Sequence, residues 1–256
     1  LVYPVDKGSG ATTSLVEADG VVEVDADTEY LAAGETVSVR LFSPDVRPPT
    51  LFGVGEDDPA LSRLLDDVAR PRYLPVGSRE GLRRLRDGLP DVAVTAGPTR
   101  REVDHVDLGG WQREWGLVVS PDTDVDGLAD LVDGDVRFVN RGVNSGLRAD
   151  LDGALDALAD ERDVDRTALT DSIDGYELAA RAHESPARKV LAGTADVGLG
   201  LRATATKLDL RFVSLGRQSV RVRAAPGRVD KPGVEALATR LDDVSDVLGT
   251  LPGYET

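Results

Sequence analysis

From residue 51 onward, short apolar runs alternate with segments of helical periodicity. The runs LFGVG, RYLPVG and DVAVTAG have the length and composition of buried strands, and PALSRLLDDVA and REGLRRLRDG between them are amphipathic. Strands that alternate with helices in this way pair in parallel, with the helices as crossover connections. The order therefore predicts an α/β lobe that begins at residue 51.

A second lobe of the same kind is expected from about residue 117. WGLVVS and VRFVNR are predicted strands, and residues 145–158 place four leucines on one face of a helix. Beyond them ADVGLG and LRFVSL predict strands, and 186–192 and 232–248 predict helices. The whole stretch 51–256 is thus predicted to be two α/β lobes.

The first 43 residues have a different pattern. VVEVDA and ETVSVRLF alternate apolar and polar side chains, which is typical of strands, and AAGE between them supplies a turn. SPDVRPPT then brings three prolines together with polar residues. We predict a β domain over 1–43, a linker over 44–50 and a second domain over 51–256.

Composition excludes several kinds of chemistry. The chain has no cysteine and two histidines, so disulfides, iron–sulfur clusters, thiolate zinc sites and cysteine nucleophiles are excluded, and we predict no metal site. Acidic residues number 46 against 30 basic ones, a net charge of −16 that disfavours binding to nucleic acid or an anionic membrane. No apolar run is long enough to span a membrane. We expect a cytoplasmic protein.

The kinds of charged residue point to an origin rather than a function. Aspartate outnumbers glutamate 33 to 13, and only four of the 30 basic residues are lysine, which is typical of proteins from halophiles. The net charge is therefore weak evidence about ligands. The chain has no methionine, so we expect it to be part of a longer protein.

Two stretches resemble known families. GSGATTSLVEADGVVEVDADTEYLAAGETVSVRLF (8–42) resembles the C-terminal β domain of molybdopterin molybdenumtransferases. DPALSRLL, VGSREGLRRLRDG, RFVNRGVNSGLR, GTADVGLGLRA and LPGYE, in that order over 52–254, resemble a periplasmic-binding-protein-like domain. That domain is found in archaea and bacteria behind the transferase or behind a helix-turn-helix.

The resemblance implies an α/β fold class: a small N-terminal β domain followed by a two-lobed type 2 periplasmic-binding-protein-like fold. Lobe one would hold about 51–115 and 214–256, and lobe two about 117–213. The transferase's catalytic domains would precede residue 1. The chain is then not expected to be catalytic alone or to hold a cofactor, and its expected partners are the upstream molybdenumtransferase domains and, through them, a homodimer.

In such a fold the ligand cleft is lined by strand ends and helix N-termini, where free N–H groups favour an anion. Ser78, Asn144 and Ser145 stand at predicted helix starts, where small polar residues either cap the helix or bind a ligand. Arg141 directly follows a strand, and its guanidinium suits an oxyanion, although it could instead pair with one of the many aspartates.

Tyr176 and His183 complete the candidate ligand-binding set, because both match the family pattern. The residues between them depart from it: Ala179 and Ala180 replace two acidic residues. Glu56-Asp57 stands where the resemblance leads us to expect Ser-His, and two negative charges at a helix N-terminus compete with an incoming anion.

These observations favour a binding module. The first hypothesis is that the lobes close over a small anionic ligand such as molybdate or tungstate, by hydrogen bonding and without covalent chemistry. The alternatives are a degenerate cleft in an interaction or structural domain, and the effector domain of a transcription regulator. No GxSxG or phosphate-loop motif supports hydrolysis.

Overall fold

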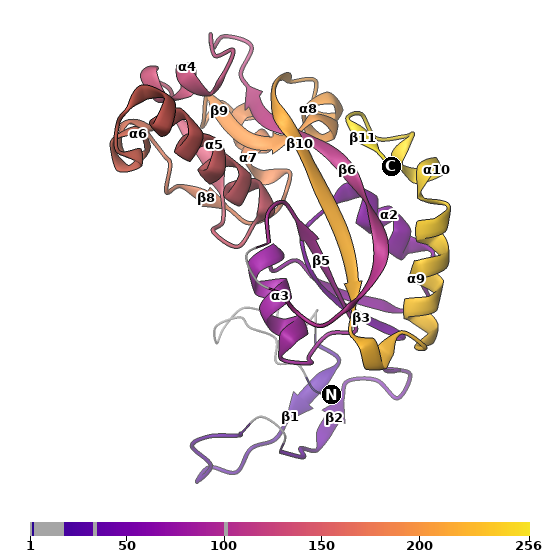
Figure 1. Cartoon of the computed structure of the whole chain (residues 1–256). Coiled ribbons are helices and arrows are strands. Elements are labelled where there is room, and N and C mark those ends of the chain that lie inside the picture. The colour runs from indigo at the N-terminus through magenta and orange to yellow at the C-terminus, as the bar shows by residue number, and fades with distance from the viewer. Residues whose placement is uncertain (1, 3–17, 33–34, 100–101) are drawn as a thin grey trace. The chain divides into compact units, whose positions relative to one another are not determined.

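The computed structural model describes residues 2, 18–32, 35–99 and 102–256, in two units, Leu1–Pro48 and Pro49–Thr256 (Figure 1). In the first unit, β1 (Gly20–Val22) and β2 (Val39–Leu41) form an antiparallel pair. This is the small β sheet predicted for the N-terminal region. The middle of the turn AAGE (33–34) and nearly all of the segment before residue 18 lie outside the described residues.

The second unit is built on one curved nine-stranded sheet, with strand order β4-β3-β5-β10-β6-β9-β7-β8 and β11 paired to β6. Its strands are β3 (Leu51–Gly55), β4 (Pro71–Leu74), β5 (Val92–Ala96), β6 (Val106–Val119), β7 (Phe138–Arg141), β8 (Ala179–Ala180), β9 (Val197–Leu201), β10 (Arg211–Ala224) and β11 (Tyr254–Glu255). β3 pairs in parallel with β4 and β5, and β7 with β8 and β9, as the strand–helix alternation predicts.

Two long antiparallel strands, β6 and β10, run through both halves of this unit (Figure 1). One half, the first lobe, has β3, β4 and β5 with α2 (Pro59–Asp66), α3 (Ser78–Arg86), α9 (Pro232–Asp242) and α10 (Val244–Leu248). The other half, the second lobe, has β7, β8 and β9 with α4 (Leu128–Asp133), α5 (Gly146–Arg162), α6 (Arg166–Ser172), α7 (Ser185–Leu191) and α8 (Arg202–Lys207). This is the two-lobed α/β architecture predicted.

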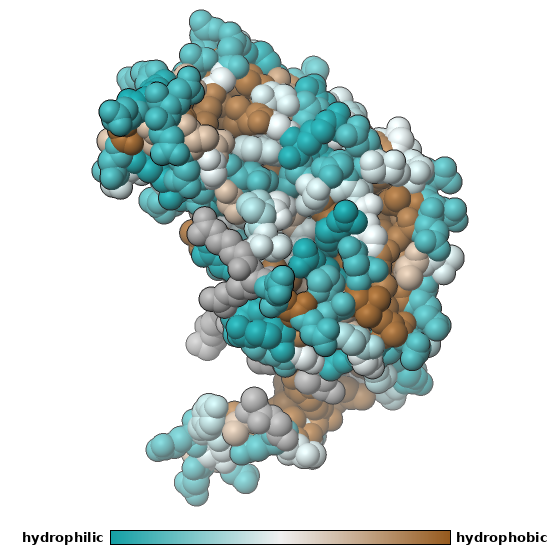
Figure 2. All heavy atoms as spheres, in the orientation of Figure 1, coloured by the Kyte–Doolittle hydropathy of each residue, from teal (hydrophilic) through white to brown (hydrophobic). Residues whose placement is uncertain are grey.

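Helix α5 shows how the pattern builds the second lobe. Its side chains at a four-residue spacing, Leu147, Leu151 and Leu155, are fully buried, whereas Asp156 and Asp160 are exposed. Each buried leucine contributes about 1.5–3 kcal/mol of transfer free energy. On the face drawn in Figure 2, hydrophilic residues cover the outer helices of this lobe. None of the described helices is long and apolar enough to cross a membrane.

Three predicted elements have other bounds in the structure. The single helix predicted over 232–248 is two helices, because Asp243 leaves helical geometry (φ −105°, ψ 24°) between α9 and α10. Strands β6 and β10 are each 14 residues long, longer than WGLVVS and LRFVSL. Their polar extensions lack a continuous apolar run because exposed or half-buried residues interrupt the buried ones. The sequence pattern therefore indicates only the apolar end of each strand, which is buried in β6 and mostly half-buried in β10.

Candidate functional site

Three consecutive carboxylates lie where β3 gives way to α2, and the third of them starts the helix. Asp58 is the N-cap: its Oδ1 accepts hydrogen bonds from Ala60 N (2.8 Å) and Leu61 N (3.1 Å). Its Oδ2 accepts from the guanidinium of Arg113 (2.8 Å) and the hydroxyl of Tyr254 (3.0 Å). Asp58 is therefore fully used by structural contacts.

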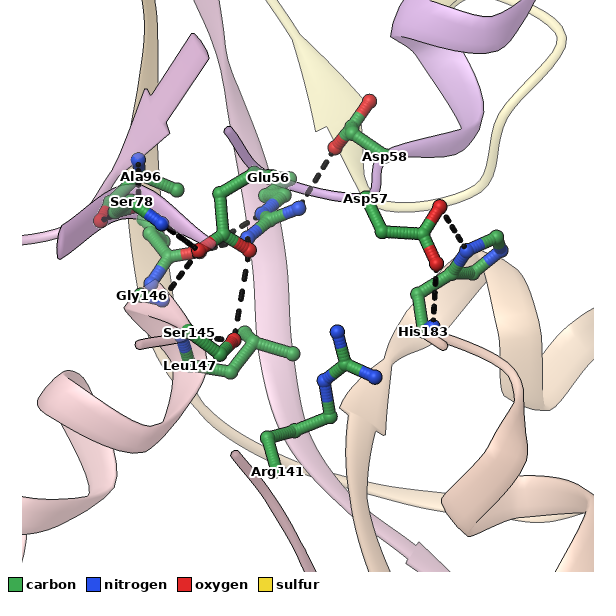
Figure 3. Close-up of polar contacts among 12 residues, drawn as sticks. Glu56, Asp57, Asp58, Ser78, Ala96, Arg141, Ser145, Gly146, Leu147 and His183 are labelled. Carbon is green, nitrogen blue, oxygen red and sulfur yellow. Dashed lines mark hydrogen bonds and ion pairs between the residues drawn. The ribbon is translucent and has the colours of Figure 1, made fainter. Parts of the chain in front are cut away.

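The Glu56 carboxylate sits between the N-termini of two helices from opposite lobes (Figure 3). Oε1 accepts from Ser78 N (3.0 Å) and Ser78 Oγ (2.8 Å) at the start of α3, and from Gly146 N (2.6 Å) at the start of α5. Ser145 Oγ lies 3.4 Å from Oε2. Glu56 is 1 % exposed, so these donors replace its water. The two helix N-termini form an anion site, and the anion in it is a side chain of the chain itself.

A close approach of two loops brings these helix starts together. Gly77, at φ +84°, precedes α3, and a Cβ there would lie 2.5 Å from the carbonyl oxygen of Asn144 in the opposite lobe. Arg79 N donates to that same oxygen at 3.1 Å. Only glycine permits both the left-handed conformation and this approach.

Asp57 makes a second contact between the lobes. Its Oδ2 accepts from the backbone N of His183 (2.8 Å), and its Oδ1 lies 3.0 Å from Nδ1 of the same residue (Figure 3). Burial acts to raise the pKa of Asp57, but the hydrogen bonds and charge of His183, with a smaller contribution from Arg141, outweigh it and lower the pKa. The ionised carboxylate is the form that joins the lobes.

Arg141 is a buried cation without a carboxylate partner. It ends β7, is 3 % exposed, and its side chain points toward Glu56 and Asp57 (Figure 3). Its nearest acceptor is the carbonyl of Ala180 at 3.4 Å, its Nε has no acceptor, and among the described residues it makes no ion pair within 4.0 Å. Burial lowers its pKa, against the opposing charges of Glu56 and Asp57.

The candidate residues fall into two groups. The structure brings Ser78, Arg141, Ser145 and His183 around Glu56 and Asp57, with Asn144 at the edge through its backbone. Tyr176 lies elsewhere.

The contacts of Tyr176 are all within the second lobe. Its hydroxyl donates to Asp152 (2.6 Å) and accepts from Arg166 (2.9 Å), and its ring packs 4.0 Å from the guanidinium of Arg148. Arg148 in turn pairs with Asp152 (2.9 Å).

Sequence reasoning did not single out Arg113. It lies on β6, is fully buried, and donates to Asp58 and to Oε1 of Gln218. Burial acts to lower its pKa, but the neighbouring Asp58, Tyr254 and Glu56 outweigh burial and hold the pKa above the usual value for arginine. A signal was available: Trp111, Arg113 and Trp115 alternate along a strand and must share one face.

A cavity of about 860 Å³ adjoins this cluster between α3 and α5. Its lining includes Ser78, Asn144, Ser145 and Gly146, with arginines of α3, acidic residues of α3 and α5, and loop residues of 98–99 and 102–103. In the part of the chain that the structure describes, no group of histidine, aspartate and glutamate side chains is arranged to hold a metal ion.

The geometry of two lobes around an anion site agrees with the comparisons. The family described as "PBP superfamily domain" matches residues 62–242. The chain belongs to the PBP superfamily. The family described as "MoeA C-terminal region (domain IV)" matches residues 1–42, in line with the resemblance to molybdenumtransferases. No functionally curated protein matches the chain.

Solved structures of PBP type are similar to the second unit. A putative phosphate ABC transporter substrate-binding protein from Clostridium perfringens, with bound phosphate, is 11% identical with a TM-score of 0.58, over 78% of this chain and 96% of its own. ArgBP from T. maritima is 14% identical (TM-score 0.53, 78% and 93%). The regulatory domain of MetR, a LysR family regulator from N. meningitidis, is 9% identical (TM-score 0.55, 80% and 97%). At these identities the likeness shows the fold alone.

Proposed function

We propose that this chain is the C-terminal part of a molybdenum cofactor biosynthesis protein, and that its PBP domain binds a small oxyanion, with molybdate or tungstate as the leading candidate. The match of residues 1–42 to domain IV of MoeA supports the parent protein. The expected partners and localisation follow from that parent: upstream transferase domains, a homodimer through them, and the cytoplasm. A halophilic archaeal source is proposed from the excess of aspartate and the scarcity of lysine.

One observation carries the binding function. Two helix N-termini and a serine hydroxyl converge on a single negative group, with donor distances of 2.6–3.0 Å, and the unpaired cation of Arg141 points toward it. An array of this kind binds anions because unpaired N–H groups and the helix dipoles act together. The array can therefore bind an anion, whether that anion is a side chain or a ligand.

In the proposed mechanism the lobes close over the oxyanion without chemistry. Ser78, Ser145 and the N–H of Gly146 would donate hydrogen bonds, and Arg141 would supply the charge, with Asn144 and His183 at the rim. Tyr176 would act only by packing in the second lobe. Closure would change the surface presented to the transferase domains.

A second candidate is an interaction domain that binds no small molecule. It is favoured by the position of Glu56, because a carboxylate that accepts all three donors leaves none of them for a ligand. The effector domain of a transcription regulator has weaker support: LysR regulatory domains share the fold, but residues 1–42 match a MoeA domain.

The two candidates differ in a thermal-unfolding titration with molybdate, tungstate, sulfate, phosphate and divalent cations. A ligand that binds only the folded state raises the midpoint of thermal unfolding. At a free concentration one hundred times Kd it adds about 2.7 kcal/mol to the free energy of unfolding. If the domain is a receptor, molybdate or tungstate should stabilise it selectively, and Arg141→Gln should abolish this stabilisation. Arg137→Gln, a control on the exposed surface, should retain it. No response to any anion would reject the receptor and leave the interaction domain.

A further inference from the structure

Two of the contacts between the lobes are made by the chain's own carboxylates, beside the backbone contact of Arg79 with Asn144. Glu56, from the first lobe, accepts from Gly146 N and lies 3.4 Å from Ser145 Oγ in the second. Asp57, also from the first, accepts from His183 N in the second. Both interactions join an anion on one lobe to N–H donors on the other, which is the arrangement that a bound anion would make in a cleft of this kind.

Glu56 is not needed to neutralise the neighbouring buried arginine. The closest carboxylate to Arg113 is Asp58, at 2.8 Å, whereas Oε2 of Glu56 is 3.6 Å away. Oε1 of Gln218 accepts hydrogen bonds from Nε and Nη2 of Arg113. The main hydrogen bonds of Glu56 are those to the two helix starts, so its position is explained by them.

Arg141 gives an independent indication that the cluster has room for another arrangement. Its guanidinium is 3 % exposed and has no carboxylate of the described residues within 4.0 Å, which is unusual for a buried cation. It points toward the two interlobe carboxylates but is bonded to neither (Figure 3). An anion bound in the place of the Glu56 carboxylate would bring charge toward this arginine.

We propose that Glu56 is a built-in ligand: its carboxylate occupies the anion site of the cleft and, together with Asp57, holds the two lobes closed, so that an external oxyanion binds only by displacing it. The closed state then exists without an added ligand. The part of this inference that concerns displacement rests on the proposed receptor function; the part that concerns closure does not.

Closure can be measured directly because the chain has no cysteine. Arg86→Cys on α3 and Asp160→Cys on α5 are exposed positions on opposite lobes, and spin labels there report the interlobe distance by pulsed electron resonance. The unmodified cleft should give one short, narrow distribution. Glu56→Gln, which keeps the side chain's size but loses its charge, should shift the population to longer distances, and Asp57→Asn should do so to a smaller extent.

The controls separate an effect on the lobes from an effect on folding. Glu161→Gln makes the same chemical change on the exposed surface of α5 and should leave the distribution unchanged. If Glu56→Gln does not unfold cooperatively, Glu56→Asp replaces it, because it keeps the charge but is one methylene too short to reach both helix starts. A folded Glu56 variant with the distance distribution of the parent overturns the inference.

Adding molybdate then distinguishes the two proposals. If both hold, molybdate closes the Glu56→Gln variant again, at a concentration at least tenfold lower than it needs to stabilise the parent. If Glu56→Gln opens the lobes and no oxyanion closes them, the built-in ligand stands and the receptor function fails. Equal molybdate affinity in parent and variant overturns displacement.

Discussion

Residues 56–58 are three adjacent carboxylates with three different tasks. Glu56 accepts from two helix starts, Asp57 accepts from His183, and Asp58 caps α2 while pairing with Arg113. Their backbone leaves β3 in extended form, so successive side chains point in different directions. One acidic tripeptide thus makes contacts within the first lobe and between the two lobes.

The contact between Asp57 and His183 should give a pH-dependent part of the stability. The folded pKa of Asp57 is lowered from 3.8, so its stabilising effect is complete above the unfolded pKa and is lost as the pH falls through the folded one. At pH 7, Asp57→Asn should reduce the free energy of unfolding by about 1.5 kcal/mol, the value of a hydrogen bond to a charged group. The difference should shrink below pH 4.

Urea unfolding of both proteins between pH 2.5 and pH 7 measures this difference. Asp171→Asn, an exposed change in α6, is the control and should alter stability by less than about 0.5 kcal/mol at every pH. A loss in Asp57→Asn that is the same at pH 3 and pH 7 would show that the charge of Asp57 does not contribute.

At the scale of elements, the start of α5 is fixed by a close contact with β5. A Cβ at Gly146 would lie 2.3 Å from the carbonyl oxygen of Ala96, so no side chain fits between helix and strand. This contact fixes the position of the Gly146 N–H group, which donates to Glu56. The position of α5 therefore determines the geometry of the anion site.

Gly146→Ala should therefore destabilise the protein, whereas Gly153→Ala, seven residues further along the same helix, should stabilise it. Nothing lies within 4 Å of a Cβ at Gly153, so alanine gains about 0.5–1 kcal/mol of helix propensity there. At Gly146 the steric overlap should outweigh that gain and cost about 1–3 kcal/mol. Thermal unfolding of the pair measures both, and stabilisation by both changes would contradict the close contact.

The elements that the sequence predicts best are those with a complete apolar pattern. LFGVG and DVAVTAG become the buried strands β3 and β5, and the leucines of 145–158 face the core in α5. The polar ends of β6 and β10 and the break at Asp243 are missed, because tertiary pairing and backbone geometry decide them rather than local periodicity.

For the site, sequence reasoning identified residues but not their connections. Ser78, Ser145 and Arg141 are at helix starts and a strand end, where patterns can locate them. That Glu56 would accept from both helices depends on how the lobes approach each other, which no local pattern contains. From the sequence, the negative charge of Glu56 could be recognised as one that competes with a bound anion. That its carboxylate itself accepts from both helix starts could not be recognised.

At the scale of the whole molecule, the hydrophobic core formed by the described residues lies in the second unit. The buried clusters run from Leu51 to Tyr254 and include no residue of β1 or β2. In the first unit, the described apolar side chains of Val39, Leu41 and Phe42 are 37–51 % exposed. The two units therefore differ in how much of their stability comes from apolar burial.

Residues 49–256 should consequently fold alone. Among the residues of 1–48 that the structure describes, none belongs to a buried cluster, so their removal should move the midpoint of thermal unfolding by less than about 2 °C. Roughly 1 kcal/mol shifts a domain of this size by 2–4 °C. Calorimetry of the full chain and of 49–256 tests this, with interlobe distances from the same label pair. A midpoint more than 10 °C lower in the shorter chain, or lobes that open in it, would mean that the first unit stabilises the closed cleft. Equal midpoints and equal interlobe distances would place the determinants of closure within 49–256, where Glu56 and Asp57 lie.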